Sequence, residues 1–208
     1  MHEKEARRSL VMVARSLFAR GYAVGSAGNI SMRLEDGTYL ATPSGSSFGT
    51  ISEEDIAHFD EERNLLSGKS PTKEVPLHLA CYATHPSMRA VVHLHATYST
   101  LLASCEGLTD GLPFDPFTPY FVMRVGEVGV LPYRIPGSVL LAKDIEQRPQ
   151  FTTYLMANHG MLVCGHTLTE AVNAAEEFEE SAKLWYLGQS LPLRYLKPEE
   201  IEELKAKR

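Results

Sequence analysis

The sequence lacks paired cysteines and an excess of basic residues. Its 208 residues contain three cysteines, Cys81, Cys105 and Cys164, and no C-x-x-C pair. This odd, scattered set argues against a disulfide framework and against a thiolate zinc site, so we expect reduced core residues. Lysine and arginine number 20 against 26 aspartates and glutamates, which gives a net charge of −6. A nucleic-acid-binding protein is expected to carry a basic excess or a basic stripe, so we set that class aside.

Long apolar runs are also missing. No stretch reaches the ~18 consecutive apolar residues of a membrane-spanning helix. Residues 1–8 carry charged side chains where a secretory signal would need an apolar segment. We therefore expect a cytoplasmic protein that binds neither a membrane nor a nucleic acid.

The sequence does have the composition of a globular α/β protein. Hydrophobic residues make up 44% of the chain and charged residues 22%. The length fits one large domain with a substantial core. No repeat, low-complexity tract or shift in composition marks a boundary, so we expect a single domain over residues 1–208. Predicted helices and strands alternate along the chain, which indicates an α/β fold.

Periodicity and turn residues divide the chain into elements. We expect helices at residues 5–20, 74–83, 97–104, 138–145 and 168–187 and from Pro198 onwards. Residues 52–55 resemble a further helix start, with Ser52 as its N-cap. Strands are expected at residues 30–34, 39–41, 90–95, 154–157 and 161–163, and another ends near residues 64–69. The Pro- and Gly-rich segment 107–137 is expected to hold short strands near residues 123–125 and 129–132.

Histidines form the first candidate site. His93 and His95 lie two residues apart on a predicted strand, so period two places both imidazoles on one face. His159 precedes Gly160, which permits a tight turn after another strand end. Three neutral imidazoles with a further position open to water or substrate are typical of catalytic zinc. The alternative is that each histidine is a structural residue held by hydrogen bonds, although burying two imidazoles side by side without a partner costs free energy.

Glu74 is the second candidate. It lies at the start of a predicted helix, where an acidic side chain commonly complements the helix dipole. Near a metal, the same carboxylate would be an acid/base. His78 follows one helical turn later, and we expect it to be a structural hydrogen-bonding residue rather than a ligand.

Small-residue turns form a third candidate site. Gly28-Asn29 and Ser44-Gly45 follow or precede short strands and can offer backbone N–H groups and hydroxyls to an anion. Thr72 and Lys73 can add a hydroxyl and a positive charge. Each turn alone is a weak signal, because glycine and serine are common in ordinary turns.

Five separated motifs occur in an order that is typical of one known family. They are Gly28-Asn29-Ile30-Ser31, Thr42-Pro43-Ser44-Gly45, Lys73-Glu74, His93-Leu94-His95 and Asn158-His159-Gly160. In order and spacing they resemble the class II aldolase and adducin head family, over almost the whole chain. The resemblance implies a three-layer α/β/α sandwich with a mostly antiparallel central sheet, a zinc-dependent sugar-phosphate enzyme, and usually a homotetramer with active sites between subunits.

The resemblance also implies roles for single residues. By position, His93, His95 and His159 correspond to the ligands of one Zn²⁺ or another divalent metal per subunit. Glu74 corresponds to the acid/base, which also ligates the metal when substrate is absent. The small-residue turns described above correspond to the family's phosphate-binding turns. Tyr120 lies in the aromatic segment that resembles the family's interface loop, and it is our candidate for a catalytic residue acting across that interface.

Two departures from the family's other signatures narrow the expected activity. Fuculose-type aldolases have a Ser-Ser pair where this chain has Thr72-Lys73. Residues 117–126 and 131–137 differ from the T-H-A-D signature of the pentulose-phosphate 4-epimerases. Both departures resemble the 3-oxo-tetronate 4-phosphate decarboxylases of the family. The resemblance thus implies zinc-dependent decarboxylation of a small phosphorylated sugar acid, through an enediolate, to dihydroxyacetone phosphate and carbon dioxide.

Two alternatives remain at this point. One is a class II sugar-phosphate aldolase of the fuculose type. An epimerase or a dehydratase of the same fold is a less favoured option within the same class of enzymes. The other is a metal-free interaction module like the adducin head. The presence of Glu74 and of the histidines that correspond to ligands argues against the interaction module.

Overall fold

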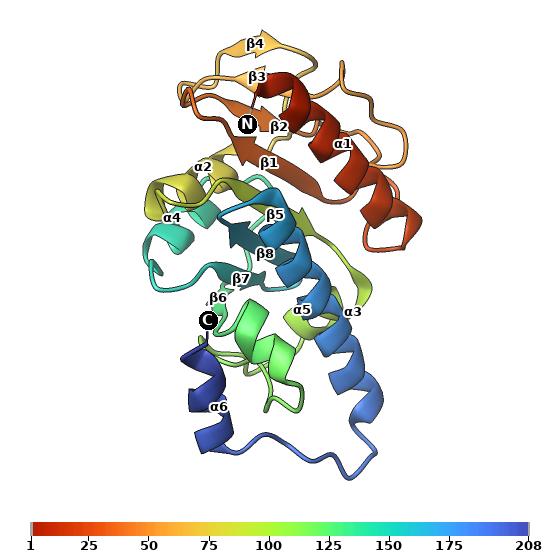
Figure 1. Cartoon of the computed structure of the whole chain (residues 1–208), viewed down its shortest axis with the longest axis vertical. Coiled ribbons are helices and arrows are strands. Elements are labelled where there is room, and N and C mark those ends of the chain that lie inside the picture. Colours follow the sequence, from red (N-terminus) through yellow and green to blue (C-terminus); the bar gives the residue numbers. More distant parts are fainter. Residues whose placement is uncertain (1, 208) are drawn as a thin grey trace.

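A single eight-stranded sheet crosses the molecule in the order β4-β3-β2-β1-β5-β8-β7-β6 (Figure 1). The computed structural model describes residues 2–207. The strands are β1 (Asn29–Arg33), β2 (Tyr39–Ala41), β3 (Ala57–Phe59), β4 (Leu65–Ser67), β5 (Ala90–Leu94), β6 (Gly129–Leu131), β7 (Thr153–Met156) and β8 (Gly160–Gly165). Among these strands, β6 and β7 pair in parallel and the other neighbours pair antiparallel. The mostly antiparallel sheet expected from the sequence is confirmed.

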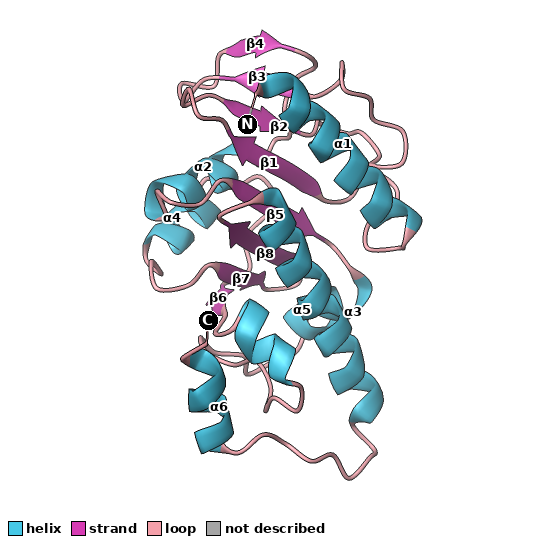
Figure 2. Ribbon diagram, viewed as in Figure 1, coloured by secondary structure: helices cyan, strands magenta, loops and turns pink. Residues whose placement is uncertain are grey.

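Helices cover both faces of this sheet. They are α1 (Glu3–Ala19), α2 (Val75–Thr84), α3 (Thr97–Ala103), the π-helix η1 (Phe121–Val125), α4 (Leu140–Glu146), α5 (Leu168–Gly188) and α6 (Pro198–Lys205). One hydrophobic core contains side chains of α1, α3, η1 and α5, and the other contains side chains of α2 and α4. Figure 2 shows α1 and α5 crossing one face of the sheet. The result is the predicted three-layer α/β/α sandwich. No helix within residues 2–207 is long and apolar enough to cross a membrane.

Strand β5 shows how the alternation of side chains separates the two cores. Val92 and Leu94 pack into the core beneath α1 and α5, whereas Val91 packs into the core beneath α2. Side chains alternate between the two faces along a strand. His93 therefore faces the layer that contains α2, and the first turn of α2 follows Glu74.

Two sequence expectations were wrong. Residues 52–55 form a turn rather than a helix start, because the Asp55 carboxylate accepts from the Ser52 backbone N–H at 3.0 Å and pairs with Lys69 at 2.7 Å. The chain then enters β3, which we did not predict. Residues 123–125 belong to the π-helix η1 rather than to a strand. Phe121 in η1 packs against Phe178 of α5, and this tertiary contact outweighs the β propensity of the segment.

Candidate metal centre and active site

Strand β5 and the residue after it supply two of the candidate ligands. His93 is fully buried, and His95 follows the strand end on the same face. His93 Nδ1 donates to the backbone carbonyl of Met161 on β8 at 2.8 Å. That hydrogen bond fixes the ring orientation and leaves Nε2 without a proton, which is the form that binds a metal.

The third candidate ligand comes from the turn between β7 and β8. Asn158 adopts a left-handed conformation with φ of 57°, and His159 follows it. A Cβ atom on Gly160 would lie 2.4 Å from the Leu94 carbonyl oxygen, which no larger residue can tolerate. Glycine at this position lets the turn pack directly on β5 and brings His159 beside the other two rings.

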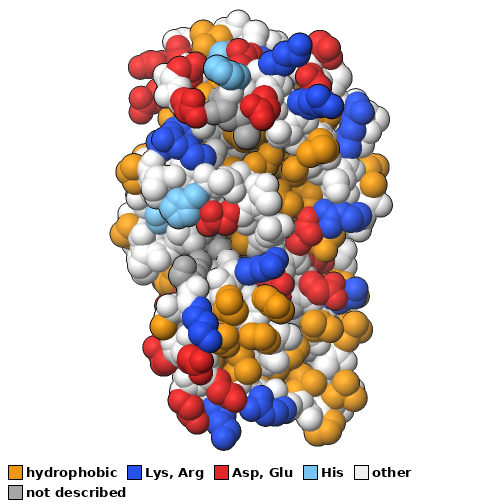
Figure 3. All heavy atoms as spheres, viewed as in Figure 1, with side chains coloured by type: hydrophobic (Ala, Val, Ile, Leu, Met, Phe, Trp, Pro, Cys, Tyr) orange, Lys and Arg blue, Asp and Glu red, His pale blue; other side chains and the backbone are white. Residues whose placement is uncertain are grey.

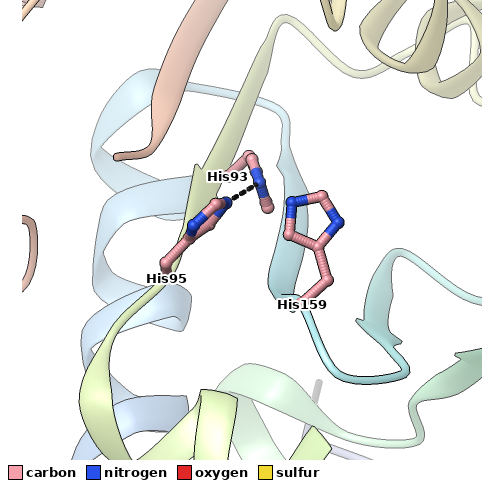
Figure 4. A group of neighbouring side chains, drawn as sticks. All are labelled: His93, His95 and His159. Carbon is pink, nitrogen blue, oxygen red and sulfur yellow. Dashed lines mark hydrogen bonds between the residues drawn. The ribbon is translucent and has the colours of Figure 1, made fainter. Parts of the chain in front are cut away.

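The three imidazoles converge, as Figure 4 shows. One nitrogen from each ring lies within 4.8 Å of the others, and the Nε2 atoms of His93 and His95 are 2.7 Å apart. Burial lowers the pKa of His93 to about 4 and lowers the pKa values of His95 and His159 as well. The rings are therefore neutral at physiological pH, and neutral imidazole is the metal-binding form. This donor set fits a single divalent metal.

Glu74 completes the cluster from the N-cap position of α2. Its Oε2 lies 3.3 Å from His93 Nε2, and its Oε1 lies 3.7 Å from His159 Nε2. Burial opposes ionisation of Glu74, but the neighbouring histidines and the Asn29 amide together lower its pKa below the usual value. Oε1 is buried and has no hydrogen-bond partner among the described residues. A buried carboxylate oxygen that faces the His159 imidazole without a hydrogen-bond partner is what a metal or a substrate proton would engage.

The Asn29 side chain lies between Glu74 and His78. Its side-chain amide donates to Glu74 Oε2 at 2.7 Å, and its carbonyl oxygen meets His78 Nε2. His78 also contacts Ser31 Oγ through Nδ1 at 2.7 Å, so the prediction that His78 is a structural hydrogen-bonding residue is confirmed. The contact between Asn29 and a phosphate stays a prediction.

The other turns that are predicted to bind an anion lie close together near the start of α2. The Ser44 backbone N–H donates to the Ser70 carbonyl at 3.0 Å, and the Thr72 N–H donates to the Thr42 carbonyl at 3.1 Å. These contacts place the loop of Ser44 and Gly45 beside the loop of Thr72 and Lys73. Ser44, Gly45 and Lys73 are exposed and so accessible to a ligand.

Gly28, which directly precedes β1, lies close to the strand that carries His93. It has a φ of +86°, and a Cβ atom there would lie 3.0 Å from the His93 carbonyl oxygen. The positive φ and this close contact both favour glycine. The turn at Gly28 therefore lies against the strand that carries His93.

Tyr120, the predicted catalytic residue besides Glu74, makes no contact with the histidine cluster among those the structure records within this single chain. It directly precedes η1, is 54% exposed, and has the Arg124 guanidinium 5.3 Å from its ring centre. Its ring contact is with Arg124 and not with a histidine of the cluster. A catalytic role for Tyr120 therefore requires a subunit interface.

Two further residues behind the cluster were missed from the sequence. Ser31 Oγ contacts both His78 and Tyr82, and both of its contacts are buried. The spacing contained a signal, because Tyr82 follows His78 by one helical turn and Ser31 follows Asn29 by two positions on β1. Ser31 therefore shares a face of β1 with Asn29, and Tyr82 shares a face of α2 with His78.

Comparison with known proteins agrees with this geometry. The class II aldolase and adducin N-terminal domain family matches residues 8–186. A 3-oxo-tetronate 4-phosphate decarboxylase of Escherichia coli O6:H1 is 46% identical over 98% of this chain and 97% of its own length. An L-fuculose phosphate aldolase of Methanocaldococcus jannaschii is 34% identical over 88% of this chain and 96% of its own length.

A solved structure shows the same fold over the full length. The crystal structure of YgbL from Escherichia coli superposes with a TM-score of 0.94 at 44% identity and covers 98% of this chain and 99% of its own. The resemblance inferred from the five sequence motifs is confirmed by the family match and by this similarity. The chain therefore belongs to the class II aldolase and adducin family.

Proposed function

We propose that this chain is a metal-dependent decarboxylase that converts 3-oxo-tetronate 4-phosphate into dihydroxyacetone phosphate and carbon dioxide. The observation that carries the proposal is the buried cluster of three neutral imidazoles with Glu74 beside them. The relative described above as a 3-oxo-tetronate 4-phosphate decarboxylase is 46% identical over 98% of this chain, and this similarity supports the proposal. The cluster supports lyase chemistry at a metal. The identity of the substrate is inferred from the relatives.

His93, His95 and His159 would hold the metal, and Glu74 would lie against it when substrate is absent. Three histidines with an open position are a set that zinc favours, so we propose Zn²⁺ as the metal. A bound divalent metal supplies a Lewis acid for the negative oxygen that develops as the carbon–carbon bond breaks.

The phosphate would bind at the turns around α2. Gly28, Ser44 and Gly45 offer backbone groups and a hydroxyl, and Lys73 is exposed beside them. The Thr72 Oγ1 accepts from the Glu74 backbone N–H at 3.3 Å, so the same loop ties phosphate binding to the position of Glu74. Binding energy at the phosphate thereby orients the ketone toward the histidines.

Glu74 would manage a proton rather than break the bond. A β-keto acid needs no base to deprotonate a leaving hydroxyl, because the carboxylate itself leaves as carbon dioxide. The bonding electrons move to the ketone oxygen and leave the enediolate of dihydroxyacetone phosphate. One carbon of this enediolate must then take up a proton, and Glu74 is the carboxyl group at the cluster that can deliver it.

Replacing Glu74 by glutamine tests that role. Glutamine has the same shape and can still accept a hydrogen bond from the Asn29 amide, so we expect the fold and metal content to be kept. The turnover number should fall by about 10²-fold or more, since a positioned acid/base contributes roughly 10²–10⁴. Steady-state kinetics with metal analysis measures both, and an unchanged turnover number would remove Glu74 from the mechanism.

The site is proposed to be completed by a neighbouring subunit in a homotetramer. Exposed hydrophobic side chains at the end of α5 and after it include Tyr186, Leu187 and Leu191, and Figure 3 shows hydrophobic side chains gathered over this lower part of the molecule. Exposed apolar patches of this kind mark association surfaces.

Tyr120 provides a test of the shared site. We expect an oligomer in solution by light scattering, and we expect Tyr120→Phe to lower the turnover number without changing the molar mass. The reason is that the exposed hydroxyl would reach a neighbour's substrate rather than support its own chain. A fully active monomer would contradict the shared site, and so would a Tyr120→Phe oligomer with unchanged turnover.

Aldol cleavage is the second candidate function, because an L-fuculose phosphate aldolase is 34% identical to this chain. Both reactions leave the same enediolate, but decarboxylation releases carbon dioxide and aldol cleavage releases an aldehyde. The deciding experiment incubates the protein with 3-oxo-tetronate 4-phosphate and, separately, with L-fuculose 1-phosphate. The proposal expects carbon dioxide from the first at the higher rate. Faster release of an aldehyde from the second would identify an aldolase.

A further inference from the structure

A buried chain of hydrogen bonds runs from Tyr82 to Glu74. The Tyr82 hydroxyl and Ser31 Oγ are 2.8 Å apart, and Ser31 Oγ is 2.7 Å from His78 Nδ1. His78 Nε2 contacts Asn29 Oδ1, and Asn29 Nδ2 donates to Glu74 Oε2 at 2.7 Å. The exposed fractions of Tyr82, Ser31 and His78 are 2% or less and that of Asn29 is 7%, so water does not compete for these contacts.

The chemistry of the groups fixes the direction of every hydrogen bond in this chain. Burial lowers the pKa of His78 to about 3, so its ring is neutral and has one donor and one acceptor nitrogen. The Asn29 amide nitrogen donates to the carboxylate, so its carbonyl oxygen must accept from His78 Nε2. His78 Nδ1 must then accept from the Ser31 hydroxyl.

The last link follows from the same reasoning. The Ser31 proton is committed to His78, so Ser31 Oγ accepts from the Tyr82 hydroxyl. All the donated protons therefore point toward Glu74. The Nε2–H of His78 holds the Asn29 carbonyl oxygen on the side away from the carboxylate, and so fixes the position of the Asn29 amide that holds Glu74.

The far end of the chain determines where the carboxylate points. Asn29 holds Glu74 Oε2, and the other oxygen, Oε1, is left facing His159 without a hydrogen-bond partner among the described residues. We propose that His78, backed by Ser31 and Tyr82, is a positioning residue that acts through Asn29 to aim Glu74 at the reacting carbon. This inference rests on the proposed function, in which Glu74 carries the proton.

Replacing His78 by leucine removes the donor to Asn29 and leaves the three metal-binding histidines unchanged. Partners that orient a group at a metal site contribute about 10- to 100-fold to activity. We expect His78→Leu to lower the turnover number by that factor with the Michaelis constant and the metal content near wild type. His78→Gln places an amide near the former Nε2 position, so it should recover part of the turnover.

Tyr82→Phe tests the same chain with a smaller change, in case His78→Leu does not fold. It should lower the turnover number by a smaller factor, because the Ser31 hydroxyl then loses the donor that orients it. The matched control is Tyr154→Phe, which also removes a buried hydroxyl, in this case one bonded to the Phe151 carbonyl at 2.6 Å. We expect the control to change the melting temperature and not the turnover number.

The experiment compares the turnover number, the Michaelis constant, bound metal and melting temperature across these variants, with a crystal structure of His78→Leu. Lost turnover at normal metal content, with the Glu74 carboxylate rotated away from Asn29, supports the positioning role. Wild-type turnover in both His78→Leu and Tyr82→Phe, or an equal loss in Tyr154→Phe, overturns it. Wild-type protein that releases no carbon dioxide overturns the proposed function instead, and the orientation of Glu74 in the crystal then still decides the positioning role.

Discussion

His95→Ala is expected to abolish metal retention and turnover together. His95 stands at the end of β5 and is partly exposed, so its removal leaves no large buried cavity. His93, by contrast, is fully buried between the sheet and α2. Two of the three proposed histidine ligands would remain, and Glu74, which is needed for proton transfer once substrate binds, would not replace the lost one. The fold should therefore survive while the site loses its metal.

Metal analysis and kinetics on the same preparation measure this result. The matched control is His166→Ala, because His166 is exposed at the other end of β8 from His159. The control should keep one metal per subunit and normal turnover. His95→Ala protein with stoichiometric metal and wild-type activity would place the metal site elsewhere.

Removing the phosphate from the substrate is expected to lower kcat/KM by orders of magnitude. The chain has a net charge of −6, so long-range attraction does not favour a polyanion. In the proposed site, affinity would come from local donors around Ser44, Gly45 and Thr72 and from the ammonium of Lys73. Without the phosphate these donors lose their partner, and the binding energy that holds the ketone at the histidines is lost as well.

The measurement compares the phosphorylated four-carbon 3-oxo acid with its unphosphorylated form under identical conditions. We expect the turnover number to fall as well as the Michaelis constant to rise, because orientation is lost with affinity. Equal kcat/KM values for the two acids would show that the turns around α2 do not bind phosphate.

The histidine cluster could be predicted from the sequence because its geometry is mostly local. Period two along β5 places His93 and His95 on one face, and the glycine after His159 indicated a tight turn. The position of Glu74 beside these histidines followed only from the resemblance. Glu74 lies beside the histidines because of a tertiary contact: β5 directs His93 toward the layer that contains α2.

Other features depend on contacts that no local pattern contains. The Asp55 side chain closes a turn on Ser52 and pairs with Lys69, so a sequence with the features of a helix cap does not start a helix. The Asn29 side chain is held between Glu74 and His78, which come from a different element, and no local pattern predicted these two hydrogen bonds. Side-chain hydrogen bonds between elements distant in sequence decide such outcomes.

Carbon dioxide release before and after metal removal tests the central claim most directly. The protein is assayed with 3-oxo-tetronate 4-phosphate in three states: as purified, after chelation, and after zinc is restored. Metal analysis and circular dichroism show that the chelated protein has lost its metal and is still folded. The account predicts equal amounts of carbon dioxide and dihydroxyacetone phosphate from the metal-loaded protein, loss of both from the folded metal-free protein, and recovery with zinc. Undiminished carbon dioxide release from folded protein that contains no metal would contradict it.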